Sequence, residues 1–510
     1  MRFSYQRFGG LNYSIYAGGL FVRVLQLQDV PHLILKEKDI LTTFQVSIFI
    51  FRELTVNKRK NKEPLRGGKA LKTDVFIAGG GVGGLALAAK LASRGVHVTI
   101  AEQLTRESPV YKGELLQPKT LAILDRLGVL DQVETCGHPI DQLRFQEIYR
   151  RKGSTPEEIN LTELNYSRVA SMYDHALMVP HEKTKSILRD KGKTYEEYYH
   201  YLHGARFLGF ENGMAKVKQN RKNLYIEAQV YIGAEGRRSP TRNAMNVHVK
   251  RHDYNHHFLT VTIPRPSDFT KGKIITTASQ FLGLFPLPDD KVRTVFLIPA
   301  GQYGAIKEKG LDFIYEAYSE LEPELSEGVR TLKDWKKIQL MIPYTYHVDH
   351  YYAGNLAIIG DAAHTVHPMA GEGMNLAVQD ADVLGELLAW CKEEGKPFEE
   401  NLHYYEDVRK PRVSFLLNLS HLSALVYSLR YEWWRTIRKQ AVQRIYDDDQ
   451  LHVKQMLNIS GLGRWDFTIL DRAVQGSIFP PRGQKVSDRR QMKYIFSETE
   501  DYPWKKVKKG

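Results

Sequence analysis

The sequence predicts an α/β fold built from more than one domain. Two segments far apart in the chain, 75–94 and 355–388, each have the pattern of a short apolar strand, a glycine-containing turn and a helix. Between them lie runs rich in β-branched and aromatic residues, at 258–263 and 294–298, which are typical of strands. A chain of 510 residues, 42% of them hydrophobic, is longer than one domain usually holds, so we expect two interleaved domains or more.

Composition and charge argue against several functional classes. Residues 1–72 hold 13 lysine and arginine residues against 5 aspartate and glutamate residues, so this segment carries +8 of the net charge of +13. The rest of the chain has no basic stripe interleaved with aromatic residues, which argues against nucleic-acid binding. The two cysteines, Cys136 and Cys391, cannot build a disulfide framework, which predicts a reducing, cytoplasmic location. No segment has the ~18–20 uninterrupted apolar residues of a membrane-spanning helix.

The first seventy residues differ from the rest of the chain. Apolar runs such as 46–51 alternate with basic clusters such as 58–60 without a helical or strand period, and the ordered pattern starts at Thr73. We expect residues 1–70 to be a non-native or disordered extension, produced by an over-long reading frame whose true start is the codon written here as Leu71. A docking or targeting arm is the alternative. The intact mass of the native protein distinguishes the two.

A dinucleotide-binding fingerprint follows the first apolar strand. Gly79, Gly81 and Gly84 have the G-x-G-x-x-G spacing, and the helix that they open runs to about Arg94. In this order, the glycines permit a tight turn, close approach of the backbone to a diphosphate, and close packing of the helix on the strand. The helix N-terminus offers N–H groups and a positive dipole end to the diphosphate. The predicted contacts of this turn are Gly79, Gly81, Val82, Gly83 and Gly84.

The second strand of this unit, residues 96–100, leads to Glu102. A carboxylate at this place accepts hydrogen bonds from a ribose. Strand, helix, second strand and terminal acid together predict a Rossmann-like dinucleotide-binding fold, whereas the alternative is a glycine turn that binds nothing. This segment alone does not distinguish FAD from NAD.

A later segment does distinguish the two cofactors, through a resemblance. The strand 355–359 runs into Gly-Asp-Ala-Ala-His at 360–364, then into the loop 368–375, and a long amphipathic helix follows. The pattern G-D-A-A-H-x-x-x-P-x-x-G-x-G-x-N resembles that of the FAD-dependent aromatic hydroxylases, the class A flavoprotein monooxygenases typified by para-hydroxybenzoate hydroxylase. The resemblance covers Thr73 to about Arg412.

The resemblance implies that the dinucleotide is FAD. Asp361 would bond the ribitol of FAD, the loop 368–375 would run beside the flavin ring, and His364 would be a structural residue of the turn. A helix N-terminus at this loop, with glycines that expose its N–H groups, would stabilise the negative charge of reduced flavin. The implied cofactor contacts of the loop are Pro368, Gly371, Gly373, Met374 and Asn375.

Three shorter segments agree with this resemblance. Residues 112–118 are similar to the R-G-E-x-L-Q-P segment of quinone-ring hydroxylases and squalene epoxidases, which implies cofactor contacts at Lys112 and Gln117. Residues 232–239 resemble the family's G-A-D-G-x-x-S segment, which touches both FAD and NAD(P)H, so the resemblance implies a cofactor contact at Glu235, which replaces the usual Asp. Residues 405–412 match the family's Y-E-x-x-R-x-P pattern. Lys112 keeps the charge of the usual Arg but not its bidentate fork, which leaves the details of NAD(P)H binding and flavin movement open.

The family's architecture is a Rossmann-like FAD-binding domain interleaved with a mixed β-sheet substrate domain, and the resemblance implies it for this chain. A helical C-terminal region is expected at 401–510. Residues 281–288 are expected either to form an aromatic pocket wall above the flavin or to be an ordinary core strand. The expected FAD-binding domain spans 71–400 and uses segments 73–140, 176–245 and 351–400, and the substrate domain uses about 141–175 and 246–350.

The implied function is FAD-dependent monooxygenation with NADH or NADPH as the reductant. O2 would supply one oxygen atom to a small aromatic or quinone-like substrate, and FAD would carry the chemistry. The sequence therefore identifies no catalytic residue. It also predicts no metal site, because the histidines at 248–257 precede strand-like sequence rather than lying on a helix. The alternatives are a flavin-dependent reductase or halogenase on the same fold, or a non-catalytic FAD-binding redox sensor.

The aromatic segment beyond Ser414 is expected to be helical. It would pack against the FAD-binding domain or against a second subunit of a homodimer. Resting on a membrane surface is the less favoured alternative.

Overall fold

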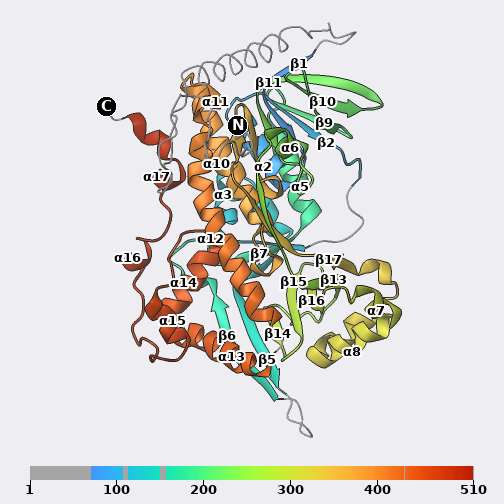
Figure 1. Ribbon diagram of the computed structural model, residues 1–510, viewed down its shortest axis with the longest axis vertical. Coiled ribbons are helices and arrows are strands. Elements are labelled where there is room, and N and C mark those ends of the chain that lie inside the picture. The colour runs from blue at the N-terminus through green and yellow to red at the C-terminus, as the bar shows by residue number, and fades with distance from the viewer. Residues whose placement is uncertain (1–69, 107–112, 150–156, 430, 509–510) are drawn as a thin grey trace, which may run out of the picture. The chain divides into compact units, whose positions relative to one another are not determined.

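Two large sheets organise the chain (Figure 1). The computed structural model describes residues 70–106, 113–149, 157–429 and 431–508. The predicted N-terminal extension, apart from its last residue, and Lys112 lie outside the described residues. Among the described helices, none is long and apolar enough to cross a membrane.

An eight-stranded sheet carries the glycine fingerprint. Its central strands run parallel in the order β20-β11-β1-β2-β8, while β19 pairs antiparallel with β20 and the β9–β10 hairpin extends from β11. The run 75–78 on β1 is buried at every residue, as expected for a parallel strand that is covered on both faces. The strands are β1 (Leu71–Ala78), β2 (Val98–Glu102), β8 (Tyr199–His203), β9 (Arg206–Glu211), β10 (Met214–Gln219), β11 (Lys222–Gly233), β19 (Tyr352–Ala353) and β20 (Leu356–Ile358).

Two helices that follow glycine turns pack against each other beside this sheet: α2 (Val82–Ser93) and α10 (Gly373–Glu393). A buried ion pair joins them, with Lys90 Nζ 2.6 Å from Asp382 Oδ1. The first of these helices is buried at every residue from Val82 to Ala92, and its glycines and alanines let the sheet and the second helix approach closely.

A seven-stranded mixed sheet forms the second layer. Its order is β17-β13-β16-β15-β14-β5-β6, in which only the β14–β5 pair, among the pairs described, is parallel. Side chains alternate between its faces. On β13, Leu259 and Val261 pack in a core with Ile314 of α8, whereas Phe258 faces the other way. The strands are β5 (Gln142–Tyr149), β6 (Glu157–Asn165), β13 (His256–Pro264), β14 (Gly272–Thr276), β15 (Phe281–Leu287), β16 (Lys291–Pro299) and β17 (Gln339–Met341).

Two small sheets and several short helices connect these layers. The small sheets have the orders β12-β18-β21 and β3-β7-β4. Their strands are β3 (Gly113–Leu116), β4 (His138–Ile140), β7 (Ala176–Pro180), β12 (Val249–Asp253), β18 (Tyr344–Val348) and β21 (His364–Thr365). The connecting helices are α3 (Pro118–Arg126), α4 (Leu130–Thr135), α5 (His181–Lys193), α6 (Pro240–Met245), α7 (Tyr303–Glu308), α8 (Leu311–Leu321), α9 (Ser326–Arg330) and α11 (Phe398–Asn401), with the 3-10 turns η1 (Tyr166–Arg168), η2 (Pro323–Leu325), η3 (Trp335–Lys337), η4 (Gly360–Ala362), η5 (Pro368–Ala370) and η6 (Pro503–Lys508).

The C-terminal region is helical, as predicted, and α13 and α14 pack against β6 (Figure 1). A buried ion pair stabilises it, with Lys454 Nζ 2.6 Å from Asp471 Oδ2. Its helices are α12 (His403–Ser428), α13 (Glu432–Asp447), α14 (Asp449–Ser460), α15 (Ile469–Gln475), α16 (Asp488–Gln491) and α17 (Glu498–Asp501).

The predicted fold class is confirmed: an α/β protein with a Rossmann-like sheet, a separate mixed sheet and a helical C-terminal region. The strands of the mixed sheet come from 142–165 and 256–341, inside the two intervals predicted for the substrate domain. Residues 68–510 nevertheless form one compact unit, so the domain boundaries stay a prediction.

Candidate cofactor and substrate site

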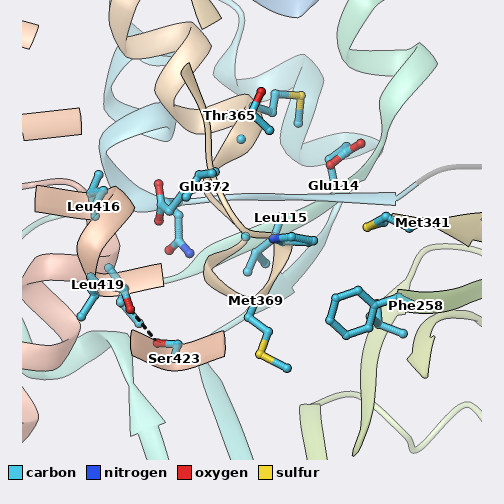
Figure 2. Close-up of a pocket in the computed structure, with 18 of the residues that line it drawn as sticks. Glu114, Leu115, Phe258, Met341, Thr365, Met369, Glu372, Leu416, Leu419 and Ser423 are labelled. Atoms are coloured by element: carbon cyan, nitrogen blue, oxygen red, sulfur yellow. Dashed lines mark hydrogen bonds between the residues drawn. The ribbon is translucent and has the colours of Figure 1, made fainter. Parts of the chain in front are cut away.

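A cavity of about 1170 Å³ joins the two layers. It is lined by the start of α2, the loop 368–374, one face of the seven-stranded sheet and the C-terminal helices. Figure 2 shows the part around this loop, with Phe258 and Met341 on one side of Met369 and Leu419 of α12 on the other. Segments far apart in the chain therefore meet at one cavity.

The glycine turn fits its predicted role at each glycine. Gly79 has a φ of +108°, and a Cβ there would lie 2.3 Å from the Ala234 carbonyl oxygen. A Cβ on Gly84 would lie 2.1 Å from the Gly79 carbonyl oxygen. These two positions exclude a side chain because other backbone comes too close. At Gly81, by contrast, no described atom outside its own chain neighbours lies within 4 Å of the added Cβ, so that glycine keeps space clear in the cavity.

The N-terminus of α2, which begins at this turn, has features that favour anion binding. Gly81 is the N-cap of α2, with no side-chain cap and no acidic residue in the first turn. Val82, Gly83 and Gly84 line the cavity, so first-turn N–H groups are available to a ligand there. A turn of this shape with exposed N–H groups fits the diphosphate of a dinucleotide.

Glu102 stands behind the turn rather than in the cavity. Its two carboxylate oxygens accept hydrogen bonds from the backbone N–H groups of Gly80 and Leu104, each at 2.7 Å. Each carboxylate oxygen has a second lone pair, which leaves an acceptor for a ribose hydroxyl. The ribose contact stays a prediction, whereas the closing of the turn is seen directly.

The Asn375 side chain anchors the loop 368–375 through hydrogen bonds. Its side-chain N–H group donates to the carbonyl oxygens of Leu115 and Gly371, both at 2.8 Å, and its oxygen accepts from the Gln117 backbone N–H at 2.8 Å. The side chain is fully buried behind the cavity wall. Asn375 therefore positions the loop, while the predicted contacts that line the cavity are Gln117, Pro368, Gly371, Gly373 and Met374.

Asp361 lies at the polar end of the cavity, beside two arginines that the sequence reasoning missed. Arg237 Nε donates to Asp361 Oδ2 at 3.4 Å. The guanidinium groups of Arg237 and Arg251 lie 4.6 and 4.3 Å from the centre of the Tyr344 ring. Arg251 is paired with Asp253, so the cation beside the Asp361 carboxylate is Arg237. A carboxylate acceptor and a cation at this place fit the hydroxyl and phosphate groups of FAD. The pair Arg237-Arg238 in the segment 232–239 was the available signal.

The Glu235 side chain does not line the cavity, and its predicted cofactor contact stays a prediction. Its carboxylate accepts hydrogen bonds from the Ser239 hydroxyl at 2.7 Å, from the Thr241 backbone N–H at 3.1 Å and from the Thr241 hydroxyl. These bonds hold the side chain at the start of α6, and burial raises its pKa. Ala234 and Gly236 line the cavity instead.

Asp380 supports the turn 360–364 from behind. Its carboxylate accepts hydrogen bonds from the Gly360 backbone N–H at 2.9 Å and the Arg409 guanidinium at 2.8 Å, and lies 2.7 Å from His364 Nε2. Burial alone would raise the pKa of Asp380, but His364 and Arg409 outweigh it and lower the pKa to about 2. His364 therefore has contacts typical of a structural residue.

Glu372 is a lining residue that the sequence reasoning missed as a functional group. It is completely buried, and neither carboxyl oxygen has a hydrogen-bond partner among the described residues. Burial raises its pKa well above 4.5, so the group favours its uncharged, proton-bearing form. A neutral carboxyl here can donate a hydrogen bond to a bound molecule (Figure 2).

His367, at the start of the same loop, is also uncharged. Its Nε2 lies 3.0 Å from His256 Nε2. Burial, and next the neighbouring His256, lower the pKa of His367 to about 3. Within the described part of the chain, no group of three or more His, Cys, Asp or Glu residues can hold a metal ion.

The wall opposite the loop is aromatic and apolar. Phe258, Phe281 and Met341 pack together with Met369 of the loop. In the segment 281–288, Phe281 and Phe285 line the cavity, whereas Leu282 and Leu284 face the core. One strand thus contributes to both the cavity wall and the core, the two alternatives expected for it. Arg293 also lines this wall, with its guanidinium donating to the Thr260 hydroxyl at 2.8 Å, and burial lowers its pKa.

Comparison with known proteins agrees with this geometry. Residues 72–420 match the family described as the FAD binding domain. The 6-methylpretetramide 4-monooxygenase of Streptomyces rimosus is 28% identical over 61% of this chain and 73% of its own length. The ubiquinone hydroxylase UbiL of Rhodospirillum rubrum is 25% identical over 71% of this chain and 83% of its own length.

Solved structures show the same fold. PqsL of P. aeruginosa, in complex with 2-aminobenzoylacetate, has a TM-score of 0.62 and 24% identity, over 70% of this chain and 97% of that one. Family match, fold and site geometry thus agree on the cofactor and on the enzyme class. The chain belongs to the FAD-binding family of the aromatic hydroxylases and is an FAD-dependent monooxygenase.

Proposed function

We propose that this enzyme hydroxylates the ring of an aromatic or quinone-like substrate, with NAD(P)H as the reductant and O2 as the oxygen source. One observation carries the proposal: the glycine turn, the loop 368–374 and the aromatic wall of the seven-stranded sheet line a single cavity. A ring held against Phe258 and Phe281 would lie next to the loop that the family places beside the flavin. The relatives named above as monooxygenase and hydroxylase support the same class.

The residues fit FAD along the length of the cavity. The first turn of α2 would hold the diphosphate, and Asp361 would accept the ribitol hydroxyls. The start of α10, at Gly373 and Met374, would stabilise negative charge on the ring through its N–H groups. When bound, FAD supplies the redox chemistry, because it takes electrons from NAD(P)H and activates O2.

The protein's own contribution is to orient the substrate and exclude water. Phe258, Phe281 and Met341 would press on the faces and edges of a flat ring. Arg293 would attract a phenol or quinone oxygen, since a cation favours the ionised form of a phenol. Glu372, whose pKa burial raises, favours its protonated form and would then donate a hydrogen bond without adding negative charge.

The test combines turnover with product analysis. The FAD-loaded protein is given NADH or NADPH with a panel of phenols and hydroquinones, and NAD(P)H oxidation, O2 uptake and products are measured. The proposal expects substrate-stimulated O2 uptake and a product that gains one oxygen from labelled O2. NAD(P)H oxidation that never yields a hydroxylated ring would overturn it in favour of a reductase. Flavin that NAD(P)H does not reduce would point to a redox sensor.

A further inference from the structure

We infer that the cavity continues beyond the ring site into an apolar arm that holds a long aliphatic chain attached to the substrate ring. This inference rests on the proposed ring hydroxylation, because it concerns the other end of the same substrate. The arm lies between α12, α13, α14 and the strands β5 and β6. The family match ends at residue 420, so α13 and α14 fall outside it.

The arm begins at the ring site itself. Tyr427 of α12 lies with its ring centre 5.7 Å from that of Phe281 and 6.4 Å from that of Phe145. All three side chains line the cavity. A ring substrate held against Phe281 would therefore direct a substituent past Tyr427 and between the helices.

The walls of the arm are aliphatic. Leu419 on α12, Val442 and Ile445 on α13, and Ile459 on α14 line it from three helices. Residues of this kind can bury an alkyl or prenyl chain at roughly 25 cal/mol for each Å² of apolar surface removed from water. These aliphatic side chains form no hydrogen bonds with a ligand.

Hydrogen bonding distinguishes a simple chain from a polycyclic substrate. Ser423 lines the arm, but its hydroxyl donates to the Leu419 carbonyl oxygen at 3.0 Å (Figure 2). The polar side chains on its walls are Thr162, whose buried hydroxyl has no partner among the described residues, and Gln455, with Arg472 and Gln475 at the α15 end. A fused polyphenol would bring several hydroxyl and carbonyl groups into this space, and each unsatisfied group costs about 1–3 kcal/mol. The lining therefore favours a hydrocarbon chain.

At its far end the arm is bordered by polar side chains of α15, and exposed apolar side chains lie on the same helix. Arg472 and Gln475 of α15 line the cavity, while Ile469 and Leu470 on the same helix are 90% and 52% exposed. Leu422 lines the cavity and is itself 48% exposed.

The first experiment measures binding without turnover. Calorimetry of the FAD-loaded protein with 4-n-alkylphenols from methyl to octyl, in the absence of NAD(P)H, gives Kd as a function of chain length. Each methylene buried in the arm should tighten binding about fourfold. An isosteric chain with two ether oxygens should lose most of this gain. A Kd that does not depend on chain length, or an ether chain that binds as tightly as the alkyl chain, would overturn the inference.

The second experiment fills the arm. Ala441→Phe adds a ring at a lining position of α13 and should flatten the dependence of Kd on chain length. Gln440→Phe adds the same ring at the exposed neighbouring position and should keep the wild-type dependence. Leu419→Trp tests the opposite wall if Ala441→Phe does not fold, with flavin absorbance and thermal melting as the checks on folding. Wild-type behaviour of a folded, arm-filled variant would refute the assignment.

The two proposals fail separately. Chain-dependent binding without any hydroxylated product would keep the arm and reject the proposed ring hydroxylation. Hydroxylation of short phenols without chain-dependent binding would keep the proposed function and reject the arm.

Discussion

Gly81→Ala separates binding of the cofactor from folding of the turn. Gly81 has a φ of −72° and a ψ of 176°, which alanine adopts without strain. Apart from its chain neighbours, no described atom lies within 4 Å of the added Cβ, so the ligand-free protein should be unaffected or gain about 0.4–1 kcal/mol from a less flexible unfolded chain. The methyl group instead enters the space kept for the diphosphate. Overpacking by one methyl costs about 1–3 kcal/mol, which corresponds to roughly 5- to 150-fold weaker FAD binding.

The assay is FAD titration of the ligand-free protein, with thermal melting of the same sample. Gly84→Ala is the contrasting variant, because its Cβ would lie 2.1 Å from the Gly79 carbonyl oxygen and should destabilise the ligand-free protein itself. Unchanged FAD affinity in Gly81→Ala would refute the assignment of the diphosphate to this turn. An unstable ligand-free Gly81→Ala protein would refute the reasoning about open space.

Three further predictions concern buried groups around the cavity. Arg409→Leu removes one of the two buried side chains that bind the Asp380 carboxylate, leaving His364, and should cost about 3–5 kcal/mol in urea unfolding at pH 7. The pKa of Asp380 is lowered in the folded state, so its stabilising effect is present above about pH 4 and lost as the pH falls toward 2, and the deficit of the variant should shrink over that range. The pKa of Glu372 is raised in the folded state, so this group lowers the stability of the wild type once the pH exceeds the pKa of Glu372 in the unfolded chain. Glu372→Gln should therefore raise Tm more at pH 9 than at pH 5. An equal rise in Tm at both pH values would contradict a raised pKa at Glu372. Asn375→Ala removes three buried hydrogen bonds, so it should lower the free energy of unfolding by about 1–3 kcal/mol and weaken FAD binding. Wild-type stability together with wild-type FAD affinity would contradict the role of Asn375 in anchoring the loop.

Local patterns carried most of what the sequence predicted correctly. The two units of strand, glycine turn and helix form where expected, because close backbone approaches at Gly79 and Gly84 leave room only for glycine. For the segment 281–288 the sequence left open whether it forms the cavity wall or the core. Successive strand residues point to opposite faces, and the sequence does not say which face meets the cavity.

Contacts that no sequence pattern specifies account for what the sequence could not predict. Glu235 has partners within its own turn that draw it away from the cavity. Asn375 accepts a hydrogen bond from the backbone N–H of Gln117, which is 258 residues away in the sequence. No local pattern indicates that pairing. The apolar arm exists only because three helices pack on β5 and β6. The cytoplasmic location, the homodimer and the nature of residues 1–70 stay predictions from the sequence.

The order of strands in the Rossmann-like sheet has a consequence for synthesis on the ribosome. β1 pairs with β11, in the register Leu71 with Ile226, and β11 in turn needs β20 near residue 356. At ~5–20 residues per second, on the order of 10 s passes between the emergence of β1 and that of its neighbour. During that time an apolar strand edge is exposed to other nascent chains. The fold therefore predicts a need for chaperone protection early in translation, and a lower soluble yield when elongation is slowed between β1 and β11.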